Sequence, residues 1–334
     1  MYKVVPKEQI FKERPMLKTI LGIDVAKSKL DVALMIGDKT LVKKFDNNKK
    51  GFKLLQGWLA SLHIEQVHAC LEATGTYGEA IAEFLYEQGH RVSVVNPFQI
   101  KSHANSQLRR NKTDKADARI IADFCSKAET EDWHPLPPEV KQLQALTRRI
   151  EALAEMLQME ENRKEVAPDA ARPSIDRMIE TLKTEIDSIT RLIKDHIDNN
   201  PNLKRQSDLL QTIPGIGEKS VRLLLGELQF GQFKSARDLA AHAGVTPRKS
   251  QSGTSLNSTR LSKIGNSRIR KALYFPAITA LKYNEVIKQF AQRLSQNGKT
   301  PMQIICAVMR KLLHIAYGVI KSDRHFDPTL ALNA

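Results

Sequence analysis

Residues 19–47 read TILGIDVAKSKLDVALMIGDKTLVKKFDN. They form three short segments rich in apolar and β-branched residues, and the turn-forming pair Gly37 and Asp38 separates the second segment from the third. Segments of this kind, joined by short turns, predict an antiparallel meander of three strands.

Beyond this meander the pattern alternates between helix and strand. The expected elements are a helix at residues 51–62, a strand at 66–75, a helix from about Tyr77 to Gln88, a strand at 91–97 and a helix beginning near Thr113. The order β-β-β-α-β-α-β-α predicts a mixed sheet with helices on its faces. Ribonuclease H-like folds share this order, so we expect an α/β domain of that type over residues 19–135, after an extension at residues 1–18.

Two seams of apolar residues follow, at residues 143–157 and 175–193, each in steps of three and four. This heptad spacing predicts two amphipathic helices over residues 136–200, with Ser174 as the N-cap of the second. The helices can form an intramolecular hairpin or a coiled coil with another copy. The heptad pattern is equally compatible with both arrangements.

The charge of the chain is concentrated near its end. The net charge is +15, yet residues 1–200 hold 31 basic and 30 acidic side chains, whereas residues 201–334 hold 21 basic and 7 acidic ones. A cationic domain attracts polyanions by counterion release, and nucleic acid is the commonest such partner. A basic surface kept for solubility is the alternative. We expect residues 201–334 to be mostly helical, interrupted by a long polar loop at residues 246–267.

The cysteines and the apolar stretches predict a location. Cys70, Cys125 and Cys306 are odd in number and widely spaced, which argues against a zinc knuckle or a disulfide framework and favours a reducing cytoplasm. No apolar stretch approaches the roughly 20 residues of a membrane helix, and residues 1–16 lack the apolar core of a signal peptide. We therefore expect a soluble, intracellular protein.

Four carboxylates stand where they could hold metal. Asp24 ends the first apolar strand, Glu72 ends another before a glycine-containing loop, and Asp114 and Asp117 lie three apart at a helix start. Taken singly, they also fit exposed strand ends and helix caps. Crowded carboxylates repel one another unless divalent cations neutralise them, and such ligands suit Mg²⁺ or Mn²⁺. Two ions about 3.5 to 4 Å apart would stabilise the attacking and leaving oxygens of a phosphodiester.

Two further motifs suggest nucleic-acid contacts. Residues 213–220, IPGIGEKS, resemble the turn of a helix-hairpin-helix motif, although a plain interhelical turn reads the same. The polar interval at residues 246–267 mixes serines with basic residues, and a serine there can act as a nucleophile or belong to a solvated loop. The candidate nucleic-acid contacts are Lys27, Arg109, Arg110, Lys112, Gly215, Gly217, Lys219, Arg248, Lys249, Arg260 and Lys263.

Several motifs occur in a specific order along the chain. They read GIDVAKSKLDV, CLEATGTYGEAIAEFLYEQG, VVNP, RRNKTDKADARIIADFC, IPGIGEKS and AGVTPRKSQSGTS. With these motifs the chain resembles, from about Thr19 to Ser322, the insertion-sequence one-ten family of transposases, also called bridge-RNA-guided recombinases. The resemblance implies an N-terminal RuvC-like domain with a DEDD carboxylate set, a coiled-coil linker and a mostly α-helical C-terminal transposase domain.

The resemblance also implies roles for individual residues. The four carboxylates of the family motif fall on Asp24, Glu72, Asp114 and Asp117, and the nucleophilic serine falls on Ser252. It further implies Mg²⁺ dependence, a serine–DNA intermediate, a homo-oligomer (a dimer or tetramer), and a structured noncoding RNA that pairs with donor and target DNA. The implied location is the bacterial cytoplasm, on the nucleoid during transposition.

Two other functions fit the same residues. A metal-dependent, structure-selective DNA nuclease resembling a junction resolvase would use water as its nucleophile and leave Ser252 without a role. A noncatalytic scaffold for nucleic acid would use the acids only as caps. Replacing Ser252 by alanine distinguishes the recombinase from the nuclease.

Overall fold

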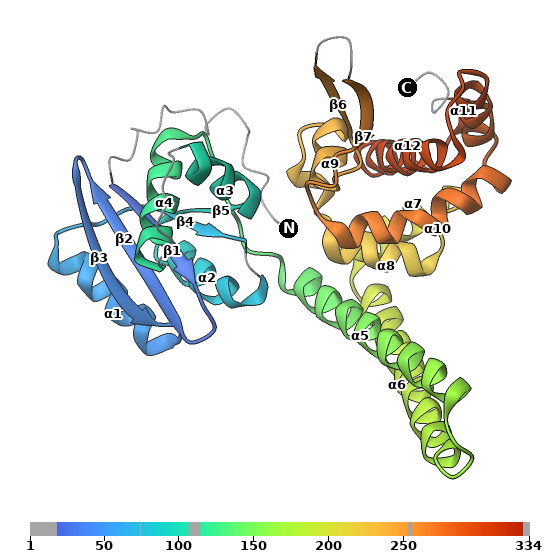
Figure 1. The fold of residues 1–334 in the computed structure, drawn as a ribbon, viewed down its shortest axis with the longest axis horizontal. Coiled ribbons are helices and arrows are strands. Elements are labelled where there is room, and N and C mark those ends of the chain that lie inside the picture. Colours follow the sequence, from blue (N-terminus) through green and yellow to red (C-terminus); the bar gives the residue numbers. More distant parts are fainter. Residues whose placement is uncertain (1–18, 74, 107–113, 253–255, 330–334) are drawn as a thin grey trace. The chain divides into compact units, whose positions relative to one another are not determined.

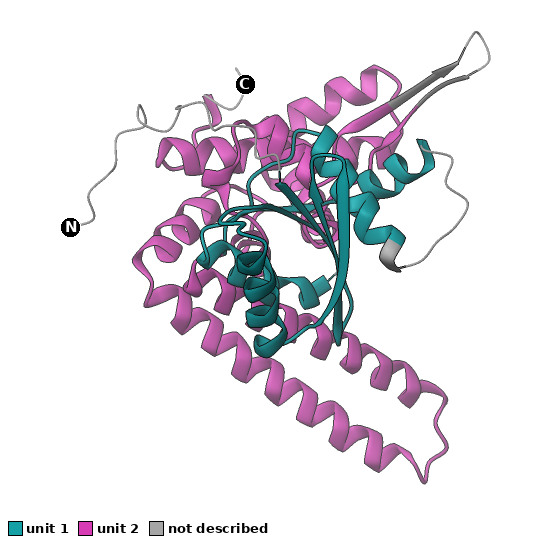
Figure 2. Cartoon of the chain, turned by 90° about the vertical axis from the view of Figure 1, so that its left-hand side faces the viewer, with its two compact units in different colours: residues 1–135 teal, residues 136–334 magenta. Residues whose placement is uncertain are grey.

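The computed structural model describes residues 19–73, 75–106, 114–252 and 256–329, except for the side chains of residues 114, 115, 249–252 and 256–258. The chain divides into two compact units, residues 1–135 and residues 136–334 (Figure 2). Each unit has hydrophobic cores of its own.

The first unit is built on a five-stranded mixed sheet in the order β3-β2-β1-β4-β5 (Figure 1). Neighbours in the β1-β2-β3 meander are antiparallel, whereas β4 pairs parallel with both β1 and β5. The predicted mixed sheet is therefore confirmed. The strands are β1 (Thr19–Val25), β2 (Lys29–Ile36), β3 (Lys39–Asp46), β4 (His68–Glu72) and β5 (Arg91–Val95).

Helices cover both faces of this sheet. One core packs the sheet against α1 and α2, and a second packs it against α3 and α4. The sequence pattern did not predict α3, a weakly amphipathic helix that begins after Asn96, whose side chain accepts a 2.9 Å hydrogen bond from the N–H of Phe98. The helices are α1 (Lys49–Ser61), α2 (Glu79–Glu87), which follows the 3₁₀ turn Gly75–Gly78, α3 (Pro97–Ser106) and α4 (Asp114–Lys127).

The second unit begins with a long helical hairpin of α5 (Pro138–Val166) and α6 (Arg172–Asp198) (Figure 1). The two helices pack through their apolar seams within one chain. The expected cap at Ser174 is wrong, because α6 begins two residues earlier. Proline is tolerated in the first turn of a helix, so Pro173 lies inside α6 and does not delay its start.

The rest of the second unit is a helical body with one small sheet. Its core contains the base of the α5–α6 hairpin and residues of every later α-helix. The elements are α7 (Pro201–Gln211), α8 (Glu218–Glu227), η3 (Phe230–Gln232), α9 (Ala236–His242), β6 (Pro247–Ser252), β7 (Leu256–Leu261), α10 (Ser267–Tyr283), α11 (Glu285–Gln296) and α12 (Pro301–Ser322).

Helix α12 corrects one expectation from the sequence. Within the described part of the chain, it is long and apolar enough to cross a membrane by length and composition. Leu312, Leu313 and Ala316 are fully buried in the core of the second unit, however, and half of the apolar window is buried. Its hydrophobicity is therefore explained by its central place among the packed helices.

Candidate active site and nucleic-acid contacts

Two of the expected carboxylates lie at the ends of neighbouring strands. β1 and β4 run parallel, and the last pair in their register is Ile23 with Leu71. Asp24 and Glu72 are the next residues on these strands, and both are half-buried. Ile23 and Leu71 belong to the core formed with α1 and α2. Because side chains alternate along a strand, Asp24 and Glu72 lie on the opposite face, which α4 covers.

Gly22 allows α4 to approach that face closely. A Cβ atom at Gly22 would lie 2.3 Å from the carbonyl oxygen of Ala118 and 2.5 Å from the backbone nitrogen of Ala122. Gly22 and Asp24 share a face of β1, and the half-buried Asp117 is the neighbour of Ala118 in the helix. The close packing at this glycine therefore fixes α4, at Ala118 and Ala122, against β1 two residues before Asp24.

The fourth carboxylate, Asp114, is the first residue of α4, and its side chain lies outside the described part of the structure. Among the described residues, no group of three or more His, Cys, Asp or Glu side chains is arranged to hold a metal ion. Carboxylate oxygens are nevertheless the donors that Mg²⁺ and Mn²⁺ prefer. The carboxylate oxygens are therefore suitable ligands for a hard divalent cation, although the described side chains do not form a closed metal site.

A carboxylate that the sequence reasoning overlooked lies opposite Asp24. Asp31 pairs with Asp24 in the β1–β2 register and is 1% exposed. Its two carboxylate oxygens lie 3.3 Å from the ammonium groups of Lys29 and Lys44. A buried charge needs such partners. The apolar run Val32–Ile36 on the same strand was the signal that could have revealed it, because a strand that is apolar on both faces is covered on both sides.

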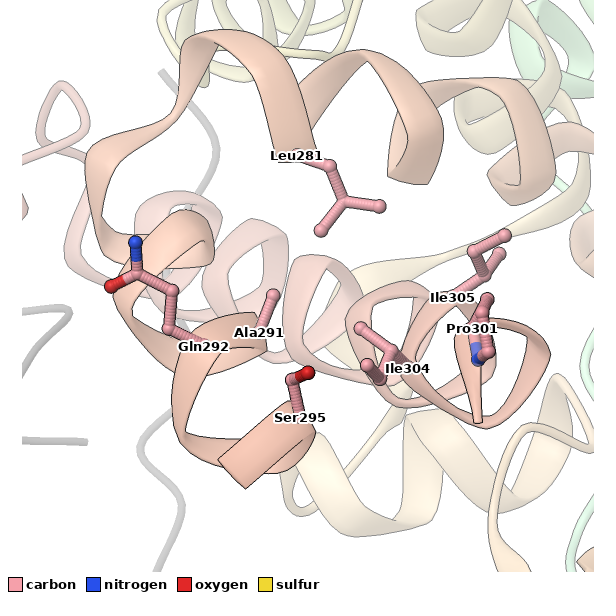
Figure 3. A pocket seen from close by; sticks show the side chains of 7 residues that line it. All are labelled: Leu281, Ala291, Gln292, Ser295, Pro301, Ile304 and Ile305. Atoms are coloured by element: carbon pink, nitrogen blue, oxygen red, sulfur yellow. The ribbon is translucent and has the colours of Figure 1, made fainter. Parts of the chain in front are cut away.

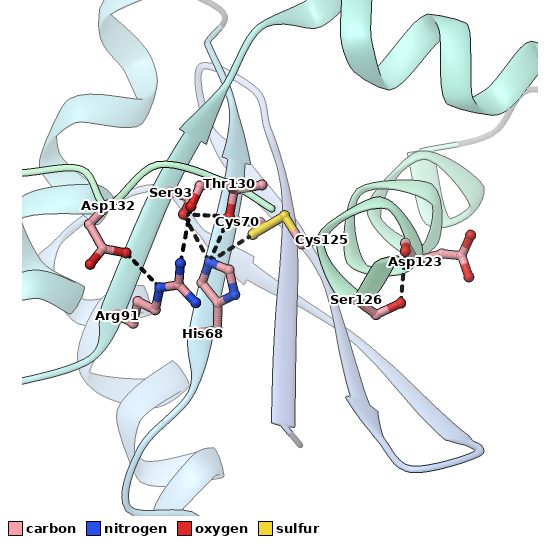
Figure 4. The surroundings of a disulfide bond; sticks show 9 residues. All are labelled: His68, Cys70, Arg91, Ser93, Asp123, Cys125, Ser126, Thr130 and Asp132. Carbon is pink, nitrogen blue, oxygen red and sulfur yellow. Dashed lines mark hydrogen bonds and ion pairs between the residues drawn. A yellow bond between two sulfur atoms is a disulfide. The ribbon is translucent and has the colours of Figure 1, made fainter. Parts of the chain in front are cut away.

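A disulfide corrects the expectation for the cysteines. Cys70 of β4 and Cys125 of α4 are bonded to each other, with their Cα atoms 6.5 Å apart (Figure 4). Because 55 residues separate them in the sequence, no disulfide was expected between them. Helix α4 packs across the sheet, however, and brings the two cysteines together. Cys306 is free. The bond ties α4, which carries Asp117, to the strand that ends in Glu72.

A polar network surrounds the disulfide (Figure 4). The Nε2 atom of His68 lies 2.8 Å from Ser93 Oγ, 3.3 Å from Thr130 Oγ1 and 3.5 Å from Cys70 Sγ. Burial, with a contribution from the nearby Arg91, lowers the pKa of His68 to about 4. His68 is therefore neutral near pH 7. The network holds the segment after α4 against β4 and β5.

The polar interval in the second unit is an antiparallel hairpin of β6 and β7, so the expected long loop is wrong. Its hydroxyl-rich and basic residues carry no apolar alternation, and that is why the strands were not predicted. Arg248 and Arg260 are directly opposite each other and exposed. Like charges at such a pair repel, and a bound anion relieves the repulsion. Ser252 is the last residue of β6.

The glycine turn at residues 213–220 connects α7 to α8. Gly215 has a φ of 108°, and a Cβ atom there would lie 2.7 Å from the Cβ of Ala280. Gly215 therefore serves backbone conformation and close packing on α10. Gly217 and Lys219 are exposed at the start of α8, where backbone N–H groups can meet a phosphate.

The other candidate contacts are divided between exposed and undescribed residues. Lys27 and Lys263 are exposed. Arg109, Arg110 and Lys112 lie outside the described residues, and so do the side chains of Lys249 and Ser252. Ser252 belongs to the second unit, whereas the four carboxylates belong to the first.

An apolar groove of about 350 Å³ lies among α10, α11 and α12 (Figure 3). None of its lining side chains is charged, so it offers no group for phosphate chemistry. The lining residues are Leu281, Ala291, Gln292, Ser295, Pro301, Ile304 and Ile305.

Family models match both parts of the chain. A transposase model of the DEDD type covers residues 21–167, and a model described as transposase IS116/IS110/IS902 family covers residues 207–292.

Individual proteins match over most of the chain. The pilin gene-inverting protein of Moraxella bovis is 36% identical over 317 residues, which cover 93% of this chain and 98% of that protein. The transposase for insertion sequence element IS1328 of Yersinia enterocolitica is 25% identical over 352 residues, covering 92% of this chain and 98% of that protein. Among solved structures, T. thermophilus RuvC in complex with Holliday junction substrate covers 34% of this chain and 99% of its own, at 14% identity and a TM-score of 0.27.

Proposed function

The chain belongs to the IS116/IS110/IS902 family of transposases, and from this premise we propose that it cuts and rejoins donor and target DNA through a covalent bond to Ser252. The carboxylates proposed to act with this serine are Asp24, Glu72, Asp114 and Asp117.

One arrangement in the first unit carries the proposal. Asp24 and Glu72 lie at the carboxyl ends of adjacent parallel strands on the face that α4 covers, and Gly22 brings Ala118 and Ala122 of α4 against β1. The four carboxylates thus come from β1, β4 and the helix α4 that packs on these strands. A purely structural role would not require two half-buried acids, Asp24 and Glu72, on one face of adjacent strands, because burying like charges near each other is costly.

The proposed chemistry conserves phosphodiester energy. Mg²⁺ or Mn²⁺, when held by the four carboxylates, would supply positive charge against the scissile phosphate. Ser252 Oγ forms a bond to phosphorus as a bridging P–O bond of the strand breaks, and the serine proton ends on the released DNA hydroxyl. Attack by a DNA hydroxyl on the phosphoserine then rejoins strands. No nucleotide is consumed, in keeping with the lack of a GxxxxGK[ST] motif in the sequence.

The similarity to a pilin gene-inverting protein favours rejoining over simple hydrolysis. Inversion of a gene requires that cut strands be joined again in a new order. A hydrolytic nuclease leaves ends that need another enzyme, whereas a covalent serine intermediate retains the bond that rejoining requires.

We also propose the nucleic-acid partners that the family resemblance implies. A structured noncoding RNA pairs with donor and target DNA, and a dimer or tetramer holds them together. The excess of basic residues in 201–334 and the opposed Arg248 and Arg260 supply phosphate contacts. In the assembled complex, the serine of the second unit and the carboxylates of the first act on the same phosphate.

The experiment uses full-length protein, Mg²⁺, RNA from the noncoding flank of the element, and end-labelled donor and target DNA. Denaturing gels are expected to show a protein–DNA adduct that requires RNA and metal and is lost in Ser252→Ala. Asp24→Asn and Glu72→Gln are expected to lose the adduct while retaining DNA binding.

Ser250→Ala is the matched control, because Ser250 lies two residues before Ser252 on the same strand. It is expected to form the adduct. Cleavage without an adduct that persists in Ser252→Ala would instead establish a metal-dependent nuclease. Nucleic-acid binding with no cleavage, unchanged in the carboxylate variants, would establish a noncatalytic scaffold.

A further inference from the structure

Helix α12 carries a row of basic residues on the side that faces away from the core. Arg310, His314 and Lys321 are spaced by four and seven residues, so they lie on one face of the helix, together with Gly318. Arg310 and His314 are half-buried, whereas Gly318 and Lys321 are exposed. The opposite face, which includes Leu312, is buried in the core. We call the first four residues the basic face of α12.

Neighbouring helices bring more positive charge to this face. Helix α12 packs on α9 and α11 within one core (Figure 1). Burial lowers the pKa of His314, and nearby cations lower it further; these are Arg310, Lys311 and, from α9, Arg237. Burial lowers the pKa of Lys311 as well, and Arg293 of α11 adds to this shift. Cations from three helices therefore lie close together.

The helices around this face contain almost no acidic residues. Residues 267–322, from the start of α10 to the end of α12, hold ten lysines and arginines and one acid, Glu285. That carboxylate lies 3.2 Å from the ammonium group of Lys288, its neighbour in α11. Most of the excess positive charge of residues 201–334 is therefore carried by this stretch.

Two polar atoms of the basic face have no partner. Among the described residues, neither Arg310 Nε nor His314 Nε2 has a hydrogen-bond partner, although both atoms are buried. A surface kept basic only for solubility would leave its cations hydrated, because burying an unpaired charge is costly. The arrangement is better explained by an anion that binds at this face and offsets its charge.

Gly318 leaves space on the basic face. It lies one turn after His314, and a Cβ atom at Gly318 would meet nothing within 4 Å. Glycine inside a helix is less favourable than alanine, and no packing contact requires it here. The missing side chain allows an elongated ligand to lie directly against the backbone of the helix.

We propose that the basic face of α12 binds the phosphate backbone of duplex DNA. The inference rests on the proposed function and names a surface by which the second unit holds its substrate. From Arg310 to Lys321 the face extends roughly 16 Å at 1.5 Å per residue, which is too long for a single phosphate ion. Single strands are usually held by stacking on exposed aromatic rings, whereas Tyr317, the one aromatic residue of α12, is buried. Basic side chains without such rings suit the backbone of a duplex.

The first test removes one charge from the face. Binding of full-length variants to fluorescein-labelled duplex DNA is measured by anisotropy over a salt series. Lys321→Gln is expected to weaken binding about three- to tenfold and to reduce the slope of log K against log salt by about 0.9, the loss of one phosphate contact. Lys299→Gln is the matched control, because Lys299 is an exposed lysine just before α12 and outside the basic face. It is expected to stay within about twofold of the wild type.

The second test adds bulk without changing the charge. Gly318→Gln replaces a glycine inside a helix, so the variant is expected to be at least as stable as the wild type in urea. It is nevertheless expected to weaken duplex binding about threefold or more, because the new side chain keeps the phosphates away from the helix. Gly57→Gln is the control: Gly57 is exposed in α1, and a Cβ atom there also meets nothing within 4 Å. It is expected to bind like the wild type.

The outcomes separate this proposal from the proposed function. Equal effects of Lys321→Gln and Lys299→Gln, or none, on a wild type that binds and recombines DNA would overturn the basic face and leave the transposase function intact. Weaker binding to labelled RNA with unchanged binding to duplex DNA would overturn duplex DNA as the occupant. A wild type that binds no DNA would overturn both proposals. Loss of duplex binding in Lys321→Gln, in a protein that forms no adduct at Ser252, would support the basic face and overturn only the proposed chemistry.

Discussion

Gly22 is a single residue on which the arrangement of the candidate active site depends. In Gly22→Ala, the new Cβ would lie 2.3 Å from the carbonyl oxygen of Ala118, so α4 must move away from β1. Overpacking of this kind costs about 1 to 3 kcal/mol. We expect the first unit to lose this much unfolding free energy in urea, measured by tryptophan fluorescence, because both tryptophans, Trp58 and Trp133, belong to it.

Gly57→Ala is the control for this substitution. A Cβ atom at Gly57, in α1, meets nothing within 4 Å, and alanine favours a helix by about 0.5 to 1 kcal/mol over glycine. We expect it to be neutral or stabilising. DNA cleavage is expected to fall only in Gly22→Ala. If the two variants unfold alike, the packing of α4 on Gly22 does not position this helix.

His68 is expected to make the first unit sensitive to acid. Its pKa is lowered from 6.5 to about 4 by burial and by Arg91, so between these values the unfolded state binds a proton that the folded state does not. Stability is therefore present above pH 6.5 and lost as the pH falls toward 4. Burial lowers the pKa of His90 as well and adds to the same trend.

Urea unfolding at pH 7 and pH 5 measures this effect. The wild type is expected to lose about 2 kcal/mol over that interval from His68. His68→Gln, which has no titrating group, is expected to show a clearly smaller loss. A loss of the same size in the variant would show that other groups cause the acid sensitivity.

The positions of single site residues could be predicted only in part. Asp24 and Glu72 each end a run of apolar residues, and this sequence signal places them at strand ends, as observed. Asp31 was missed because its burial depends on Lys29 and Lys44, and Lys44 comes from a different strand. Pairing across strands is a property of the folded sheet, which local patterns do not contain.

At the scale of elements, the disulfide is expected to stabilise the first unit by joining β4 to α4. Closing a loop of 55 residues restricts the unfolded chain, and the chain-entropy estimate for this length is about 4 kcal/mol, with measured values commonly about 2 to 4. We expect dithiothreitol to lower the unfolding free energy by about 2 to 4 kcal/mol. Alkylation under denaturing conditions is expected to modify one cysteine before reduction and three after it.

Two variants check this interpretation. Cys306→Ser leaves the bonded pair intact and is expected to respond to dithiothreitol like the wild type. The double variant Cys70→Ala and Cys125→Ala is expected to be insensitive to the reductant. Modification of all three thiols in the unreduced, purified protein would show that the bond does not form in solution.

Elements with a regular apolar period were predictable, and polar ones were not. The meander, with its alternating or continuous apolar runs, corresponds to β1, β2 and β3. The predicted loop is wrong at β6 and β7 because these strands are polar and basic, and a strand without an apolar face has no apolar periodicity from which to predict it. Cys70 and Cys125 were misjudged for a related reason, since the helix–sheet packing that joins them is not local.

At the scale of the whole molecule, the proposed tasks are divided between the two units. The proposed metal ligands belong to residues 1–135, where acidic and basic side chains nearly balance, whereas most of the excess positive charge belongs to residues 136–334. Affinity for nucleic acid from the second unit depends on counterion release and not on the carboxylates. Catalysis and binding are therefore expected to respond to different solution conditions.

Removing metal is expected to abolish cleavage and leave binding nearly unchanged. With EDTA, anisotropy of a labelled duplex is expected to stay within about twofold of its affinity at matched ionic strength, because phosphate contacts to the basic residues persist. Denaturing gels of the same samples are expected to show no adduct, since no cation offsets the charge of the scissile phosphate. Asp24→Asn, with Mg²⁺ present, is expected to reproduce this pattern, whereas raised salt is expected to reduce binding and cleavage together. Loss of binding in EDTA would show that the carboxylates hold DNA through the metal, and the two units would then not divide these tasks.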